Sequence, residues 1–140
     1  MSGFNDRIIA EFRDNDGRVG GPFAGARLVL ITSTGAKSGQ PRIAPVMYFA
    51  DGETIYVIAS KAGAPTNPNW YHNLLANPKA SLELATDSGI ERFEATAEPV
   101  TGPEHDRLYA EFSRSNPGFA KYQARTNRVI PIVALRRIRD

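Results

Sequence analysis

The chain has 140 residues, of which 41% are hydrophobic and 23% are charged, and it contains no cysteine. This length suits one domain, 1–140, and is too short for a dinucleotide-binding domain joined to a separate catalytic domain. The net charge of +2 excludes the strong basicity of a nucleic-acid-binding domain, and the missing cysteine excludes disulfides, thiolate metal sites and a cysteine nucleophile.

Neither a secretory signal nor a membrane-spanning segment is recognisable. The longest aliphatic runs, such as LVLI at 28–31, are far shorter than the ~20 residues that cross a bilayer. The N-terminus, MSGFNDRIIAEF, carries acids and lacks an apolar core. We therefore expect a cytoplasmic protein without nucleic-acid partners.

The segment 1–20 is predicted to form a short amphipathic helix followed by a loop. Phe4, Ile8, Ile9 and Phe12 fall on one helical face, with charged residues on the other. Such a helix usually docks on its own domain. Peripheral membrane contact through this face and the basic C-terminus is the alternative.

Branched and aromatic residues then predict β-strands separated by turn residues. The expected strands are 28–33, 42–50, 54–60, 79–85, 91–100 and 129–138. Asp51-Gly52 predicts a tight hairpin, and Asp87-Ser88-Gly89 predicts a second one. Because proline has no N–H, Pro45 indicates an edge or a bulge in its strand. Alternation directs these side chains inward in the second hairpin: Leu82, Leu84, Phe93, Ala95 and Ala97.

Three further helices interrupt the strands. Asn67-Pro68 predicts a helix start, with the asparagine as cap and the proline in the first helical position. Its expected apolar contacts are Trp70, Leu74 and Leu75. The other two helices are expected over 103–115, where Leu108, Tyr109 and Phe112 share helical spacing, and over 118–125. About six mostly antiparallel strands with short flanking helices indicate an α+β, mainly β fold built on a small barrel.

The stretch 32–42 has the composition of an anion site. Two glycines flank Lys37 and Ser38, so backbone N–H groups could form a concavity for an anion. Lys37 supplies a point charge, Ser38 a hydroxyl donor and Arg42 a planar fork for phosphate or carboxylate. An ordinary strand-connecting loop with solvated bases is the alternative.

A second polar stretch, 59–64, leads into the helix start at Asn67. Helix N-termini favour nearby anions, and Trp70 and Asn73 lie one turn apart on the same side. The alternative for the lone tryptophan is a role in the core.

Several chemistries have no support in the sequence. GAKSG lacks the spacing of a phosphate-binding P-loop, and Ser38 and Ser60 lie in no nucleophile elbow. His72 and His105 are too far apart for a local metal pair, so both are expected to have structural roles and no metal site is expected.

Three motifs in order carry a family resemblance: TGAKSGQPR, then SKAGA, then NPNWYHN, with TNRVIPIV closing the chain. Together they resemble the deazaflavin-dependent nitroreductase family, over about 27–133. The resemblance implies a split β-barrel that uses coenzyme F420, a deazaflavin with a phosphate-bearing oligoglutamate tail. It also implies hydride transfer to a small flat acceptor such as a quinone, a nitroaromatic or an activated enone.

The resemblance also assigns site residues by position. Lys37 and Ser38, with Arg42, would hold the phosphate and acidic tail, while Ala36 stands where an arginine is frequent. The positions expected at or beside the deazaflavin are Pro45, Met47, Ile58, Ser60, Lys61, Asn69, Trp70 and Asn73. Met47 stands where the family frequently has a tyrosine, so this side of the expected deazaflavin site is more flexible.

The acceptor is expected near Asn116, Phe119 and Tyr122, where the family often has tyrosines. Only Tyr122 keeps its hydroxyl, which favours a flat, more apolar acceptor. Ser60 could hydrogen-bond the charge that develops on the acceptor, and Tyr122 or solvent could supply the proton.

Two other functions stay open from the sequence. One is an oxidoreductase that uses FMN in the same kind of barrel. The other is a non-catalytic module that sequesters a cofactor or binds a membrane surface. A monomer and a homodimer are both compatible with the sequence.

Overall fold

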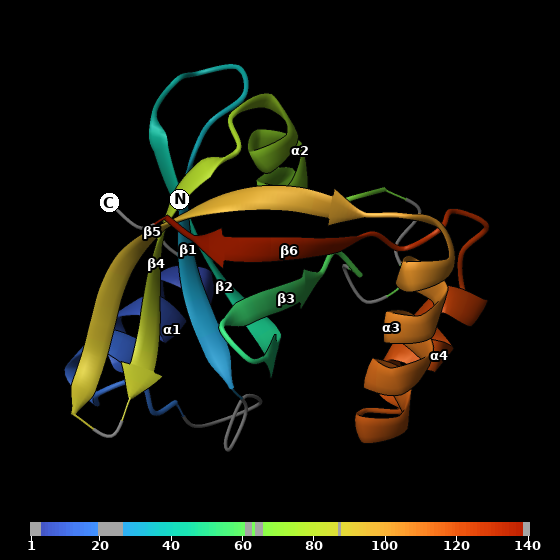
Figure 1. Ribbon diagram of the computed structural model, residues 1–140. Helices are drawn as coiled ribbons and strands as arrows, with labels where there is room; N and C mark the ends of the chain where they lie inside the picture. The colour runs from blue at the N-terminus through green and yellow to red at the C-terminus, as the bar shows by residue number, and fades with distance from the viewer. Residues whose placement is uncertain (1–3, 20–26, 61–62, 64–65, 87, 139–140) are drawn as a thin grey trace.

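The computed structural model describes residues 4–19, 27–60, 63, 66–86 and 88–138. Within them, antiparallel strands close into a barrel in the order β1-β2-β3-β6-β5-β4 (Figure 1). The strands are β1 Leu28–Thr34, β2 Pro41–Asp51, β3 Thr54–Ile58, β4 Lys79–Thr86, β5 Gly89–Val100 and β6 Ile132–Arg137. The helices are α1 Phe4–Asp14, α2 Asn69–Ala76, α3 Gly102–Ser115 and α4 Gly118–Ala124. The mainly β barrel predicted from the sequence is confirmed.

The barrel interior is filled by alternate residues of every strand. Val29 and Ile31 of β1 point into it, as do Leu82 of β4 and Ala95 and Ala97 of β5. Leu84 and Phe93 pack against the same cluster, so the predicted alternation in the second hairpin is confirmed.

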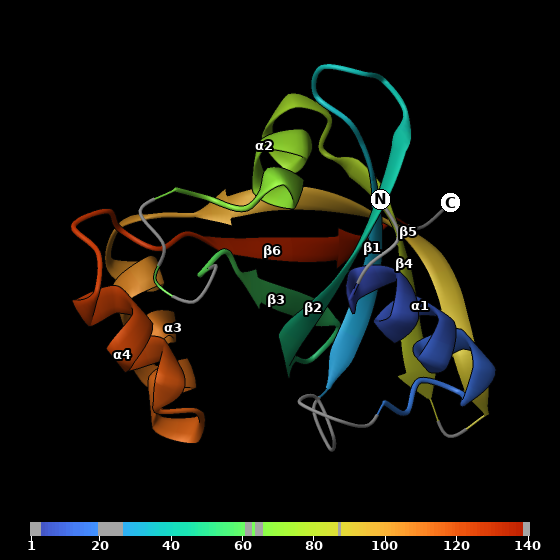
Figure 2. The same cartoon turned by 180° about the vertical axis from the view of Figure 1, so that it is seen from behind.

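Helices bury the outer face of some strands, which explains their unbroken apolar sequences. Leu28 and Leu30 of β1 lie in a cluster under α1, and Tyr56 and Ile58 of β3 lie in a cluster under α3 and α4. α3 and α4 lie side by side at the opposite side of the barrel from α1 (Figures 1 and 2). A strand covered on both faces needs apolar residues in succession rather than alternation.

The apolar face of α1 docks on the barrel. Ile8 is 5% exposed and Phe12 is fully buried, both against Leu28 and Leu30. The alternative that these two residues contact a membrane is therefore wrong; the side chain of Phe4 lies outside the described part. Among the described residues, no helix is long and apolar enough to cross a membrane.

The start of α2 differs from the prediction by one residue. Pro68 is the N-cap, and the side chain of Asn67 accepts a hydrogen bond from Arg128 instead of capping the helix. Leu74 is buried as expected, whereas Leu75 is 49% exposed because it faces away from the barrel. Trp70 packs on the barrel interior, so α2 covers one end of the barrel.

Pro45 lies at an edge, as predicted. β2 pairs with β1 without a break, Leu30 opposite Pro45, and pairs with β3 only from Tyr48 onward. Among the described strands, one side of β2 therefore has no partner at Pro45, where a missing N–H costs nothing.

Candidate functional site

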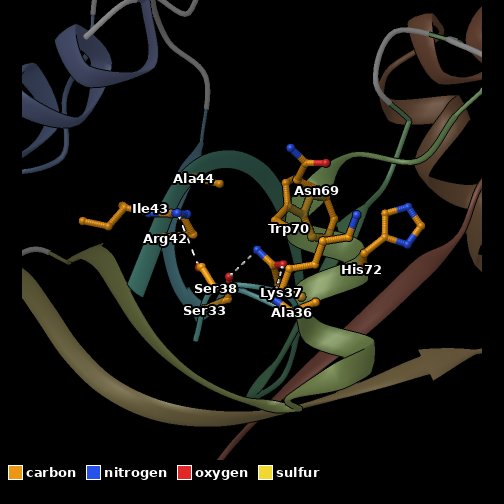
Figure 3. A pocket seen from close by; sticks show the side chains of 12 residues that line it. Ser33, Ala36, Lys37, Ser38, Arg42, Ile43, Ala44, Asn69, Trp70 and His72 are labelled. Carbon is orange, nitrogen blue, oxygen red and sulfur yellow. Dashed lines mark hydrogen bonds between the residues drawn. The ribbon is translucent and has the colours of Figure 1, made fainter. Parts of the chain in front are cut away.

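A cleft of about 670 Å³ lies between the β1–β2 connection and α2 (Figure 3). The connection and the helix stand next to each other at the same end of the barrel (Figure 1). The lining residues are Ser33, Gly35, Ala36, Lys37, Ser38, Arg42, Ile43, Ala44, Asn69, Trp70, His72 and Asn73. The structure thus brings the predicted cationic stretch 32–42 against the predicted positions Asn69, Trp70 and Asn73 of α2.

The β1–β2 connection is a compact turn closed by its own backbone. The N–H of Gly35 donates to the carbonyl of Gln40 at 2.8 Å, and the N–H of Gly39 donates to the carbonyl of Gly35 at 3.0 Å. Gly39 has φ +70°, a conformation that favours glycine. This turn presents Lys37 and Ser38 at its exposed tip.

Ser38 is fixed as a hydrogen-bond acceptor on its protein side. Its Oγ accepts from the N–H of Gln40 at 3.1 Å and from Nη2 of Arg42 at 3.4 Å. Because the oxygen accepts in both contacts, its proton is left to be donated into the cleft. Arg42 and Lys37 add two positive charges, and none of the described residues that line the cleft is acidic. The arrangement can bind an anion by charge and by hydrogen bonds.

Asn73 connects the two walls of the cleft. It is 8% exposed, its Oδ1 accepts the N–H of Ala36 at 2.9 Å, and its Nδ2 donates to Oγ of Ser33 at 3.5 Å. With both ends of its amide engaged, Asn73 holds the turn against α2.

The cleft also has an apolar side that the sequence did not reveal in full. Trp70, half-buried, and Ala44 line the cleft with apolar side chains, whereas the side chain of Ile43 points away from Trp70 and packs on the cluster beneath α1 (Figure 3). Ile43, Ala44 and Ser33 were missed, although the adjacency of the first two to Arg42 in one strand could have indicated them. His72, expected to be structural, is exposed and lines the cleft.

Other predicted cofactor positions do not line this cleft. Met47 packs in the cluster beneath α1, and Ile58 is 5% exposed in the cluster beneath α3 and α4. Pro45 and Ser60 are half-buried, each outside the lining. Lys61 lies outside the described residues.

The predicted acceptor residues are on and beside α4. Phe119 is 6% exposed and meets Phe49 edge-on at 5.7 Å, so its ring is part of the core. Tyr122 is half-buried and contacts Phe119 edge-on, while Asn116 ends α3 with its N–H donated to Phe112.

Two ionisable residues of α3, His105 and Tyr109, have structural roles. Nε2 of His105 lies 2.7 Å from the carbonyl of Ile130, which fits the expected structural role. Tyr109 donates to the carbonyl of Phe119, and burial raises the pKa of Tyr109 to about 12. Tyr109 therefore stays protonated near neutral pH. Among the described residues, no cluster of histidines and carboxylates could hold a metal ion.

Comparison with known proteins gives one consistent result. A family model described as "F420H(2)-dependent quinone reductase" matches residues 6–137. An F420H(2)-dependent quinone reductase of Mycobacterium tuberculosis (strain ATCC 25618 / H37Rv) is 40% identical over 132 residues, which cover 91% of this chain and 86% of that protein.

Solved structures agree with the sequence comparison. A structure described as an F420-H2 dependent reductase (FDR-A) is similar with a TM-score of 0.67 and 35% identity, over 78% of this chain and 93% of that one. A second, described as a domain-swapped dimer, has a TM-score of 0.68 and 33% identity, over 93% of this chain and 92% of that one.

Proposed function

The chain belongs to the F420H(2)-dependent quinone reductase family, and from this premise we propose that its cleft binds the anionic tail of F420 and that its acceptor is a quinone. The enzyme is an oxidoreductase that uses reduced F420 as the hydride donor. The assignment of individual residues to these tasks is the proposal.

One observation carries the proposal: Lys37, Ser38 and Arg42 meet in a single cleft that, within the described part of the chain, has no acidic lining residue. The neighbouring cleft, between α1 and β2, shares Arg42 but is also lined by Asp6 and Asp14, and its other cation, Arg13, is paired with Glu83. A tail with several carboxylates and a phosphate would be repelled by those acids and attracted by the two cations of the first cleft. The residues present therefore fit the tail.

The apolar side of the same cleft suits a flat ring system. Trp70 and Ala44 supply its apolar side chains, while the side chain of Ile43 packs on the cluster beneath α1. F420 supplies the hydride when it is bound; the protein binds, orients and excludes water. We assign Trp70 to orientation of the ring system and Lys37, Ser38 and Arg42 to retention of the tail.

Ser60 and Tyr122 are proposed to act on the acceptor. The N–H of Gly63 donates to the carbonyl of Ser60, and a Cβ at Gly63 would lie 2.8 Å from the carbonyl oxygen of Tyr122. These contacts support a common location for the two residues. We propose that the Ser60 hydroxyl stabilises negative charge on the acceptor oxygen and that the Tyr122 hydroxyl holds a proton to be delivered there.

Absorbance or fluorescence titration with F420, and in parallel with FMN, tests cofactor choice. We expect micromolar or tighter binding of F420 and none of FMN. Lys37→Ala should raise the Kd for F420 about fivefold, the effect of one exposed charge pair. Lys79→Ala, which removes an exposed lysine outside this cleft, is the matched control.

Added salt should weaken the binding of F420 to the wild type and reduce the ratio of the Kd of Lys37→Ala to that of the wild type, since exposed charges are screened. Equal affinities for the wild type and Lys37→Ala would disprove the assignment of the tail to this cleft. Quinone-dependent oxidation of F420H2 by the purified protein tests the acceptor. Wild-type protein that binds F420 but does not oxidise F420H2 with any quinone would contradict the proposal that the acceptor is a quinone.

A further inference from the structure

The guanidinium of Arg128 binds the segment that joins β3 to α2. Its Nη1 donates to the carbonyl of Ala59 at 3.2 Å and to Oδ1 of Asn67 at 2.6 Å. Its Nη2 donates to the carbonyl of Ser60 at 2.8 Å. One side chain thus contacts both ends of this joining segment, 59–67.

Arg128 is itself held in place by α4. Nε2 of Gln123 donates to the carbonyl of Arg128 at 2.7 Å, and Oε1 of Gln123 accepts the N–H of Ile130 at 3.0 Å. The N–H of Arg128 also donates to Oγ1 of Thr126 at 3.3 Å. The side-chain amide of Gln123 therefore stabilises the turn between α4 and β6, and the side chain of Arg128 extends from a backbone that is held in place.

The middle of the joining segment packs directly on α4. Gly63 is buried with φ +80°, and a Cβ there would meet the carbonyl oxygen of Tyr122 at 2.8 Å and Cβ of Arg125 at 3.0 Å. This close approach, together with the Arg128 contacts, fixes Ser60 relative to the helix that carries Tyr122.

We propose that Arg128 is a positioning residue for acceptor reduction. It sets the place of Ser60 against α4 by binding the backbone carbonyls of 59 and 60 and the side chain of Asn67. It does not contact the anion cleft, whose lining excludes it. This inference rests on the proposed roles of Ser60 and Tyr122 and predicts a defect in acceptor use rather than in binding of the F420 tail.

The geometry of the guanidinium is the reason that lysine cannot replace it. A planar fork directs donors from two nitrogens toward three acceptors at once, whereas an ammonium group presents its donors from a single atom. Arg128→Lys keeps the charge and loses the fork. A purely electrostatic role would therefore survive this substitution, and a positioning role would not.

The experiment compares Arg128→Lys with Arg107→Lys, an exposed arginine of α3 that pairs only loosely with Glu104 and Glu111 among the described residues. Steady-state oxidation of F420H2 by a soluble quinone is measured together with the Kd for F420. In Arg128→Lys we expect kcat/KM for the quinone to fall about tenfold or more, as small misplacements of reacting groups do. The Kd for F420 should stay within about twofold, and Arg107→Lys should match the wild type.

A second pair of measurements separates positioning from loss of fold. Methylguanidine at millimolar concentration should restore part of the quinone activity of Arg128→Ala and should not affect Arg107→Ala. If Arg128 variants do not fold, Asn67→Ala decides the matter, since it removes one of the three acceptors and should lower quinone kcat/KM with unchanged Kd for F420.

Two results would overturn the inference. One is quinone activity of Arg128→Lys, or of Asn67→Ala where it is needed, within about twofold of the wild type. The other is a loss of F420 affinity in Arg128→Lys as large as the loss of activity. Wild-type protein that fails to bind F420 or to reduce the quinone would instead refute the proposed function.

Discussion

Replacing Glu83 by glutamine is expected to destabilise the protein by about 2 kcal/mol near neutral pH, because the carboxylate is buried while its partner Arg13 is 37% exposed. The Glu83 side chain is only 6% exposed. Nε and Nη2 of Arg13 donate to its two carboxylate oxygens at 2.9 and 2.7 Å, and Arg92 lies 3.3 Å away. Glutamine keeps the shape of the side chain but leaves the Arg13 charge without its partner.

The size of the effect follows from burial rather than from the number of ion pairs. Glu98 also pairs with an arginine, Arg136, at 3.4 Å, but the two side chains are 66% and 56% exposed. Exposed pairs contribute about 0–1 kcal/mol, so Glu98→Gln should be nearly neutral. It is therefore a matched control for the loss of one carboxylate charge from the barrel.

The stability difference should depend on pH in a defined direction. The hydrogen bonds from Arg13, opposed in part by burial, hold the pKa of Glu83 below its usual range. The stabilisation is therefore fully present above the unfolded pKa of about 4.3 and is lost as the pH falls through the lower folded pKa. The wild type and Glu83→Gln should converge in acid and keep a constant difference above about pH 5.

Urea denaturation followed by tryptophan fluorescence, at a series of pH values, measures both effects. At neutral pH the variant should also melt roughly 7 °C below the wild type, from about 3–4 °C per kcal/mol for a domain of this size. The double variant with Arg13→Gln isolates the coupling between the two side chains. The reasoning is refuted if Glu83→Gln loses no more stability than Glu98→Gln, or if its deficit grows as the pH falls.

Two further substitutions test the joining segment and the cleft. Gly63→Ala is expected to cost about 2–3 kcal/mol, because its backbone has φ +80° and a Cβ would lie 2.8 Å from a carbonyl oxygen; Gly52→Ala, with φ +62° in open space, should cost about 1 kcal/mol. Equal losses in urea denaturation would count against the close approach to α4. Asn73→Leu should weaken F420 binding about tenfold, since the N–H of Ala36 loses its acceptor and the turn its anchor. An unchanged Kd in the same titration would mean that the turn is held without Asn73.

The strands and the cationic turn could be predicted because both are local in sequence, whereas the pairing of β1 with β4 and of β3 with β6, which closes the barrel, could not. Strands with apolar residues in succession, such as LVLI and TIYVI, are covered on both faces, and the alternating strand β5 is buried mainly on its inner face. Lys37, Ser38 and Arg42 lie within one short connection, so their proximity needs no knowledge of the fold. The helix start at Asn67 was misplaced because Arg128, far along the chain, takes the asparagine side chain that would otherwise cap.

The sequence by itself determined the strand pattern, the composition of the turn and, through its motifs, the family. Tertiary structure alone decided which polar side chains form hydrogen bonds between segments that are distant in the sequence. Asn73 reaches Ala36 over 37 residues, Arg128 reaches Ala59 over 69, and Arg13 reaches Glu83 over 70. Alternation assigns Glu83 to the outer, polar face of its strand, and only the docking of α1 buries it. Hydrogen bonds between distant segments leave no periodicity in the sequence, because their partners are brought together by packing of the apolar faces and not by spacing along the chain.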